Sequence, residues 1–214
     1  MKKPYVILDF DGTIANTNNI IVESWQATFE HYLGHRKPVR EVEATFGETL
    51  KHTIEELLPG EDYEEVRDFY RDYQYAHNKG AVYVFDGVRE MMELLKVEGH
   101  RIGIATSRTA HSFWTYMREL DLDEYVDVLV TMEDVKKHKP DPESINKVLE
   151  QFGAGPEEAI MVGDTKYDIG CANNAGVDSV LVRWSHYVDE EAMEAEGYVP
   201  TYYIDKPDEL MELI

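Results

Sequence analysis

The chain has 214 residues, 43% of them hydrophobic and 30% charged, which is typical of a soluble globular protein with one domain and an insertion, or with two small domains. The formal net charge of -22 argues against a nucleic-acid partner, because phosphate backbones are bound through clustered Lys and Arg side chains. No apolar run approaches the roughly 18 residues that a membrane span needs, and the single cysteine, Cys171, excludes an internal disulfide, so we expect a cytoplasmic protein in which this thiol packs in the core.

The first predicted element is a buried strand over residues 5–8, which runs directly into the sequence DFDGT at residues 9–13. Because successive side chains of a strand alternate faces, we expect Asp9 and Asp11 to project from the same side of its carboxyl end, while Gly12 permits a sharp turn. Two carboxylates in one small site are costly unless a cation or a proton separates their charges. Enzymes use such a pair as a nucleophile and a proton carrier.

A helical insertion is predicted over residues 15–81. This segment offers amphipathic helical stretches, of which 20–33 and 63–75 are the clearest, and no strand pattern. We interpret it as an all-helical cap domain inserted after the first strand. Its aromatic residues recur at helical spacing, which favours a helical core over a surface that stacks ligands. The chain returns to the first domain near residues 82–87.

The rest of the chain alternates between strand and helix patterns. The predicted strands span residues 101–106, 126–131, 159–163 and 178–182, and the predicted helices span 87–97, 112–122 and 144–152. Such alternation implies a Rossmann-like α/β core, a parallel sheet covered by helices on both faces, with its active groups beyond the carboxyl ends of the strands. This core domain would comprise residues 1–14 and 82–214. Its closing segment, residues 186–214, carries nine acidic residues and one lysine, and we expect it to be exposed surface.

Polar residues follow four of the predicted strands, and they are, in chain order, Asp9 and Asp11, Thr106 and Ser107, Lys139, and Asp164 and Asp168. These segments, in this order, resemble the four motifs of the haloacid dehalogenase superfamily, in the branch that has a helical cap between the first and second motifs. The resemblance covers the chain up to about Ser185. A single motif of this kind is a weak signal, but four in order near predicted strand ends are a specific one.

The resemblance implies a phosphohydrolase. Asp9 would attack phosphorus and form an aspartyl-phosphate, and Asp11 would protonate the leaving oxygen and then take a proton from the hydrolytic water. Thr106 would bind a phosphate oxygen through its hydroxyl, helped by the backbone amides of Ser107 and Asp11. Lys139 would balance the negative charge of Asp9 and of the phosphate.

The backbone at Gly12 completes the predicted phosphate-binding set. The predicted cofactor is Mg²⁺, held by Asp9, by a backbone carbonyl at Asp11 and by Asp164. Asp168, four residues after Asp164, is expected on the same helix face, either as a ligand or behind one. Mg²⁺ favours oxygen ligands, and the chain lacks the His and Cys spacing of a zinc site. The alternative interpretation is that Asp164 is a helix N-cap and Asp168 is solvated.

The second acid, Asp11, favours phosphate chemistry over dehalogenation, because a dehalogenase has no leaving oxygen to protonate. The predicted specificity loop covers residues 45–50. Hexose-phosphate mutases of this branch have an arginine where Leu50 stands here, so the loop resembles more closely that of phosphoglycolate phosphatases and the related bacterial pyrophosphatases. The expected partner is therefore a small phosphorylated metabolite, bound by a monomer or a homodimer.

Candidate substrate contacts in or near the cap are Gly47, Glu48, Lys51, His52 and Arg108. Lys51 and Arg108 are the best cations for an anionic substrate. For Glu48, Lys51 and His52, however, the pattern favours an ordinary helix surface over a substrate contact.

Two other functions stay open at this point. A sugar-phosphate mutase of the β-phosphoglucomutase type would convert one sugar phosphate into an isomer without net release of phosphate. A receiver-like phospho-acceptor module would be labelled once and would not turn over. Such a module needs only roughly 120 residues, and it leaves the helical insertion unexplained.

Overall fold

The computed structural model describes residues 3–185 and 190–214. Within them lies a six-stranded sheet in the order β5-β4-β1-β6-β7-β8, and every neighbouring pair of its strands is parallel. The strands are β1 (Tyr5–Leu8), β4 (Arg101–Ala105), β5 (Val128–Val130), β6 (Ala159–Gly163), β7 (Asp178–Val182) and β8 (Tyr202–Ile204). The chain starts in the middle of the sheet, adds β4 and β5 on one side and then β6, β7 and β8 on the other. The order therefore reverses at β1, where open α/β sheets bind their ligands.

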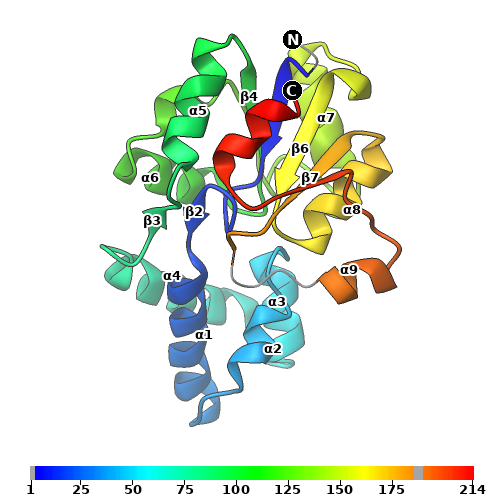
Figure 1. Ribbon diagram of the computed structural model, residues 1–214. Coiled ribbons are helices and arrows are strands. Elements are labelled where there is room, and N and C mark those ends of the chain that lie inside the picture. Colours follow the sequence, from blue (N-terminus) through cyan, green and yellow to red (C-terminus); the bar gives the residue numbers. More distant parts are fainter. Residues whose placement is uncertain (1–2, 186–189) are drawn as a thin grey trace.

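Helices cover both faces of the sheet (Figure 1). They are α5 (Val88–Val97) and α6 (Ala110–Glu119) on one face, and α7 (Glu143–Phe152) and α8 (Lys166–Ala175) on the other. The side chains of β1 alternate between two apolar clusters, one on each face of the sheet. Val6 and Leu8 pack with α5 and α6, whereas Ile7 packs with α7 and α8. All three side chains are fully buried, and burial of such a side chain stabilises a fold by roughly 1.5–3 kcal/mol. Cys171 packs in the second of these clusters, as the sequence predicts.

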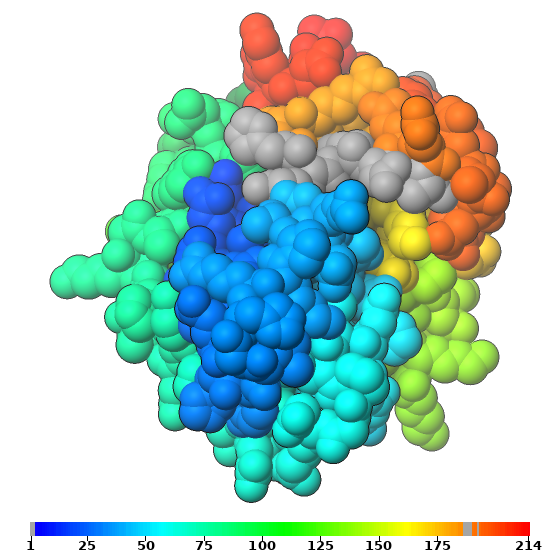
Figure 2. All heavy atoms as spheres, turned by 90° about the horizontal axis from the view of Figure 1, so that it is seen from below, coloured from blue at the N-terminus to red at the C-terminus, as the bar shows by residue number. Residues whose placement is uncertain are grey.

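Residues 15–81 form the helical insert, which we define by those bounds. Its helices are α1 (Asn18–Leu33), α2 (Val39–Glu43), α3 (Leu50–Leu57) and α4 (Tyr63–His77). They enclose an apolar cluster of their own, in which the Trp25 ring lies 5.6 Å from that of Phe29 and 5.0 Å from that of Tyr70. The aromatic residues at helical spacing are thus core residues of the insert. Seen from below, the insert, in blue to cyan, extends across the middle of the molecule (Figure 2).

Where the chain enters and leaves the insert, two short strands pair antiparallel. They are β2 (Ala15–Asn16) and β3 (Tyr83–Val84). Two residues are too few for an alternating pattern, so the sequence predicts neither strand. The pairing fixes both connections between insert and sheet side by side, close to the end of β1.

The expectation that the closing segment is exposed surface is wrong for part of it. β8 adds the last strand to the sheet, Ile204 and Leu210 are buried, and the 3-10 helix η3 (Pro207–Glu212) lies against α5. Residues 190–195 form α9 (Glu190–Ala195). The remainder of the predicted acidic surface, residues 186–189 with Asp189, lies outside the described residues. Among the residues that the structure describes, no helix is both long and apolar enough to cross a membrane.

Candidate active site

The carboxyl ends of three neighbouring strands bring the predicted motifs together. Asp9 follows β1, Thr106 follows β4, and Asp164 follows β6. The ladder holds these ends in register, since the Asp9 amide donates to the Val162 carbonyl at 3.0 Å and the Thr106 amide donates to the Val130 carbonyl at 3.0 Å. Segments as far apart in the chain as Asp9 and Asp164 therefore meet at one edge of the sheet.

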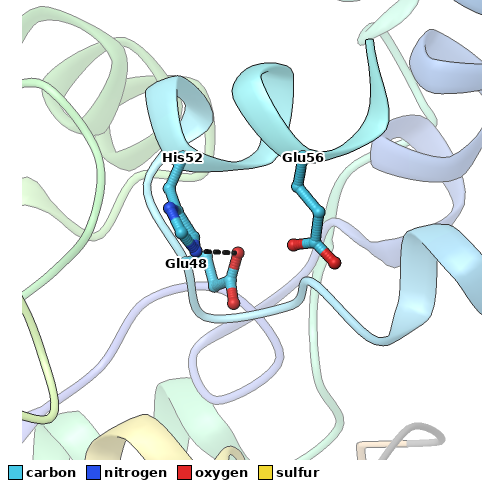
Figure 3. Close-up of side chains that lie close together, drawn as sticks. All are labelled: Glu48, His52 and Glu56. Carbon is cyan, nitrogen blue, oxygen red and sulfur yellow. Dashed lines mark ion pairs between the residues drawn. The ribbon is translucent and has the colours of Figure 1, made fainter. Parts of the chain in front are cut away.

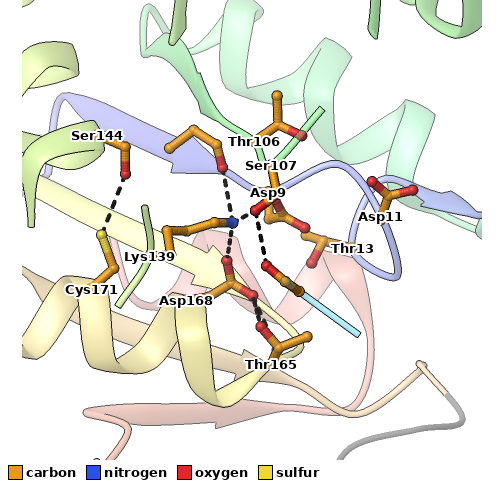
Figure 4. Close-up of polar contacts among 12 residues, drawn as sticks. Asp9, Asp11, Thr13, Thr106, Ser107, Lys139, Ser144, Thr165, Asp168 and Cys171 are labelled. Carbon is orange, nitrogen blue, oxygen red and sulfur yellow. Dashed lines mark hydrogen bonds and ion pairs between the residues drawn. The ribbon is translucent and has the colours of Figure 1, made fainter. Parts of the chain in front are cut away.

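Lys139 lies at the centre of this site (Figure 4). Its amine donates to Asp9 Oδ1 at 2.8 Å, to Asp168 Oδ1 at 2.6 Å and to the Ala105 carbonyl at 3.2 Å. Its side chain is only 3% exposed. Burial by itself lowers the pKa of the amine, but the carboxylates of Asp168 and Asp9 outweigh it and hold that pKa above its usual value. The lysine is therefore a fixed cation that orients one oxygen of Asp9.

Asp168 is fully buried and both of its carboxylate oxygens are engaged. One accepts from Lys139, and the other accepts from the Thr165 amide at 3.1 Å and from the Thr165 hydroxyl at 2.7 Å. The last two contacts belong to a capping box in which Thr165, not Asp164, is the N-cap of α8. A solvated Asp168 and an N-cap at Asp164, the alternative interpretation of this motif, do not fit these contacts.

Asp9 and Asp164 are buried carboxyl groups whose charge the protein alone does not fully balance. Burial raises the pKa of Asp9 to about 7; Lys139 opposes this shift, and Asp168 and Asp11 add to it. The pKa of Asp164 is raised well above its ordinary value, first by burial and then by Asp168 and Asp9. The Ser185 hydroxyl donates to Asp164 Oδ2 at 2.7 Å, which favours the ionised form only in part.

The cluster fits a divalent cation. One carboxylate oxygen from each of Asp9, Asp164 and Asp168 lies within 4.8 Å of the other two, and all three residues are buried. Hard oxygen donors in this number suit Mg²⁺, which keeps part of its coordination shell for water and substrate. Gly12 leaves the space open: its φ is +74°, and a Cβ there would lie 2.0 Å from Asp164 Oδ2. Only glycine fits this turn against Asp164.

Asp11 does not point toward Asp9 in the way that strand alternation predicts. The strand ends at Leu8, and the amides of Ile14 and Ala15 both donate to the Phe10 carbonyl, so the chain is already turning at Asp11. The Asp11 carboxylate is directed away from Asp9 (Figure 4). The alternation of side chains along a strand therefore does not extend to Asp11, because the chain has left the strand by then.

Arg108 is the partner of Asp11. Its Nε donates to both Asp11 oxygens at 2.8 and 3.0 Å, and its Nη2 donates to Oδ1 at 2.6 Å. The guanidinium lies over the rings of Tyr116 and Phe10, at 4.7 and 5.3 Å from their centroids. Burial opposes the charge of Arg108, but Asp11 and its hydrogen bonds raise the pKa of the guanidinium above its usual value. The hydroxyl of Thr17 also donates to Asp11 Oδ1, at 2.6 Å.

The predicted specificity loop packs on the core beside the site. The Ser107 hydroxyl donates to the Gly47 carbonyl at 2.9 Å, and a Cβ at Gly47 would lie 2.7 Å from the Tyr167 ring. The Tyr167 hydroxyl donates to Glu48. Ser107 thus uses its side chain to hold the insert, in addition to the backbone role predicted for it.

Glu48 also belongs to a second group of side chains, together with His52 and Glu56 (Figure 3). His52 Nε2 lies 3.7 Å from Glu48 Oε2, but His52 and Glu56 are exposed. Lys51 lies 3.9 Å from Glu55 on the exposed side of α3. The structure therefore does not bring His52 or Lys51 to the site at the end of β1.

A cavity of about 130 Å³ separates the insert from the end of the sheet. Its size suits a substrate of few atoms, because pockets for drug-sized ligands measure roughly 300–1,000 Å³. Several polar lining residues are absent from the sequence-based set, among them Asn18, Arg71, Gln74 and Tyr75. Gln74 is a buried polar residue beside Val66 and Tyr70 on the buried face of α4, which is a signal that could have found it. Asn18 gives no such signal, because the buried face of α1 carries several polar residues.

The comparisons with known proteins agree with this geometry. Residues 6–182 match the family model described as haloacid dehalogenase-like hydrolase. A protein of Caldanaerobacter subterraneus subsp. tengcongensis, provisionally named pyrophosphatase PpaX, is 37% identical over 214 residues, which are 100% of this chain and 96% of that protein. Pyrophosphatase PpaX of Bacillus mycoides is 34% identical, over 100% of this chain and 98% of its own length. A crystal structure from Bacteroides fragilis, provisionally described as a haloacid dehalogenase-like hydrolase, superposes with a TM-score of 0.84 at 26% identity and covers 100% of both chains.

The chain therefore belongs to the haloacid dehalogenase-like hydrolases. Within that family it is an enzyme of the phosphatase type. Its α/β core with a parallel Rossmann-like sheet is the fold that the sequence predicts.

Proposed function

We propose that this enzyme is a cytoplasmic, Mg²⁺-dependent phosphohydrolase that acts on a small phosphorylated metabolite of the pyrophosphate or phosphoglycolate type, through an aspartyl-phosphate on Asp9. The observation that carries the proposal is the buried cluster of Asp9, Lys139, Asp164 and Asp168 beneath a small cavity at the switch point of the sheet. Full-length similarity to proteins named pyrophosphatase supports the choice of substrate class.

Asp9 is the proposed nucleophile. Lys139 fixes one of its oxygens, which leaves the carboxylate oriented for attack on phosphorus. As the new oxygen–phosphorus bond forms, the bond from phosphorus to the leaving oxygen breaks and its electron pair goes to that oxygen, which takes a proton from Asp11. Water then hydrolyses the aspartyl-phosphate, and Asp11 accepts the proton of that water.

The surrounding residues balance charge and position the phosphate. Mg²⁺, when bound by Asp9, Asp164 and the backbone carbonyl of Asp11, supplies positive charge to the phosphate oxygens. Asp168 holds Lys139 in place through its 2.6 Å contact. The proposed phosphate-binding groups are the Thr106 hydroxyl and the backbone at Gly12, Ser107 and Asp11.

We further propose that residues 15–81 act as a cap domain over a core domain made of residues 1–14 and 82–214. The separate apolar cluster of the insert and its position across the cavity support this division. The contacts of Gly47 with Ser107 and of Glu48 with Tyr167 would hold the cap against the core. A closed cap excludes water other than the molecule used in hydrolysis.

The proposal is tested by measuring phosphate release from pyrophosphate, phosphoglycolate, sugar phosphates and an aryl phosphate, in Mg²⁺ and in EDTA. We expect repeated turnover of the first two substrates, which EDTA abolishes. Asp9→Asn should lower kcat by at least about 10³-fold, since loss of a nucleophile is among the largest single effects in enzymes. Unchanged activity of Asp9→Asn would rule out the nucleophile. Isomerisation of a sugar phosphate without phosphate release would indicate a mutase, and labelling without turnover a phospho-acceptor module.

A further inference from the structure

Both carboxylate oxygens of Asp11 are occupied. Arg108 donates to both of them, and Thr17 donates to one. The Arg108 side chain is 9% exposed and that of Asp11 is 26% exposed. The pair therefore forms a largely desolvated, fork-shaped contact, which is the strong type of ion pair.

This contact conflicts with the proton transfer proposed for Asp11. A general acid must come within about 2.6–3.2 Å of the atom that it protonates. The leaving oxygen lies in line with Asp9, whereas the Asp11 carboxylate is turned away from Asp9 (Figure 4). Arg108 holds that carboxylate through its Nε and Nη2. Arg108 must therefore release Asp11 before the leaving oxygen can be protonated.

Release needs a substitute anion, because a buried guanidinium without a partner is costly. Arg108 lines the same cavity as Asp9, and its planar fork fits a phosphoryl group or a carboxylate as well as it fits Asp11. Two other cations line the cavity in the part of the chain that the structure describes. Lys139 is committed to Asp9 and Asp168, and Arg71 is half-buried on α4. Arg108 is thus the only one of the three whose anionic partner belongs to the proposed proton-transfer step.

We propose that Arg108 determines specificity by exchange of partners: the second anionic group of the substrate binds Arg108, displaces Asp11, and frees Asp11 to reach the leaving oxygen. The inference rests on the proposed phosphohydrolase function and narrows its substrates to small molecules with a second phosphoryl or a carboxylate group. The exchange keeps Arg108 paired throughout. A phosphate ester with a neutral leaving group offers no such anion and leaves Asp11 bound to Arg108.

The test compares wild type with Arg108→Met, which keeps the apolar stem and removes every donor. For pyrophosphate in Mg²⁺, kcat/KM should fall at least tenfold, because the second phosphoryl group loses its partner. For ethyl phosphate, which carries no second anion and whose leaving alkoxide needs a proton, kcat should rise, because Asp11 is no longer held. Arg108→Lys, which keeps the charge without the fork, should lie between wild type and Arg108→Met with both substrates. A kcat for ethyl phosphate that is unchanged or lower in folded Arg108→Met overturns the exchange.

Binding gives a readout that does not depend on turnover. Methylenediphosphonate should bind wild type more tightly than methylphosphonate does in Mg²⁺, and Arg108→Met should lose most of that difference. Arg118 lies on α6, over the Trp114 ring, and Arg118→Gln is the matched control. This variant should keep the difference in affinity between the two phosphonates. An equal preference in wild type and Arg108→Met overturns the inference. Failure of the proposed phosphohydrolase function would give other results than failure of the exchange. Wild type would then release no phosphate, or Asp9→Asn would keep the activity of wild type.

Discussion

Lys139 supplies the buried positive charge in a site that contains three buried carboxyl groups, those of Asp9, Asp164 and Asp168. Its amine has three acceptors within 3.2 Å, two of them carboxylates. Exposed ion pairs elsewhere, such as that of Lys51 with Glu55, involve charges that water also solvates, and such pairs contribute little. The two kinds of lysine should therefore respond very differently to substitution.

Replacing Lys139 by methionine leaves Asp9 and Asp168 buried without their cation. We expect unfolding in EDTA at pH 8 to become easier by about 3–5 kcal/mol, as for other broken buried ion pairs, with loss of phosphate release. Chemical denaturation monitored by circular dichroism measures the change. Lys51→Met is the control and should unfold much as wild type does. An equal response of the two variants would mean that Lys139 does not carry this role.

Only some of the contacts between site residues could be predicted from the sequence. The sequence predicts that Asp9, Thr106, Lys139 and Asp164 converge, because each follows a buried strand. It does not predict the pair of Asp11 and Arg108, since these residues are 97 positions apart and leave no local pattern. The turn that starts after Leu8 decides where Asp11 points.

At the scale of elements, strands with continuous apolar runs are predicted closely. β1, β6 and β7 have the predicted bounds, and β4 differs by one residue. β8 is missed because three residues within an acidic segment give too weak a signal. For α8 the sequence predicts a helix entered near Asp164 and Asp168 but gives no bounds, because KYDIGCANNA mixes small and polar residues and has little helical periodicity. Its start is set instead by the capping box of Thr165 and Asp168.

The loop before α3 supplies a test of how the insert and the core cooperate. Gly47 has φ +91°, and a Cβ would meet the Tyr167 ring at 2.7 Å and Thr165 Oγ1 at 2.8 Å. Gly47→Ala should push the loop off the core and lower kcat/KM by roughly 10²-fold, as small displacements of a positioned site can.

Gly60→Ala is the matched control for that steric effect. Gly60 has φ +97°, and no atom lies within 4 Å of a Cβ built there. Both alanines carry the backbone strain of a positive φ, but only the one at Gly47 collides with the core. Steady-state kinetics on both variants decide the point. Equal losses of activity would assign the effect to strain and not to the contact between insert and core.

At the scale of the whole molecule, a chain with a net charge of -22 is proposed to bind an anion. The electrostatic field of the negatively charged protein repels an anion, so the positive charge that attracts the substrate must lie in the cavity itself. Lys139, Arg108 and Arg71 line the cavity, and a divalent cation held by Asp9, Asp164 and the backbone carbonyl of Asp11 would add to them. Mg²⁺ should therefore affect the stability of the whole fold as well as turnover.

The direction of the pKa shifts predicts how that effect depends on pH. A carboxyl group whose pKa is raised on folding stabilises the fold below its unfolded pKa, 3.8 for Asp9, and this contribution is lost as the pH rises through about 7. Asp164 is shifted in the same direction. The rise in Tm on adding Mg²⁺ should thus be larger at pH 8 than at pH 5, since protons compete with the metal. Asp164→Asn should reduce the rise. A rise as large at pH 5 as at pH 8 would contradict this account.

The most direct measurement is to trap the phosphoryl group on the enzyme. Asp11→Asn removes the group that accepts the proton of the hydrolytic water, while p-nitrophenyl phosphate has a leaving group that departs without protonation. Rapid acid quench and peptide mass spectrometry should therefore find one phosphoryl group on the peptide that contains Asp9, and none in Asp9→Asn. A phosphoryl group on any other residue, or wild-type turnover with no adduct in Asp11→Asn, would contradict the assignment of Asp9.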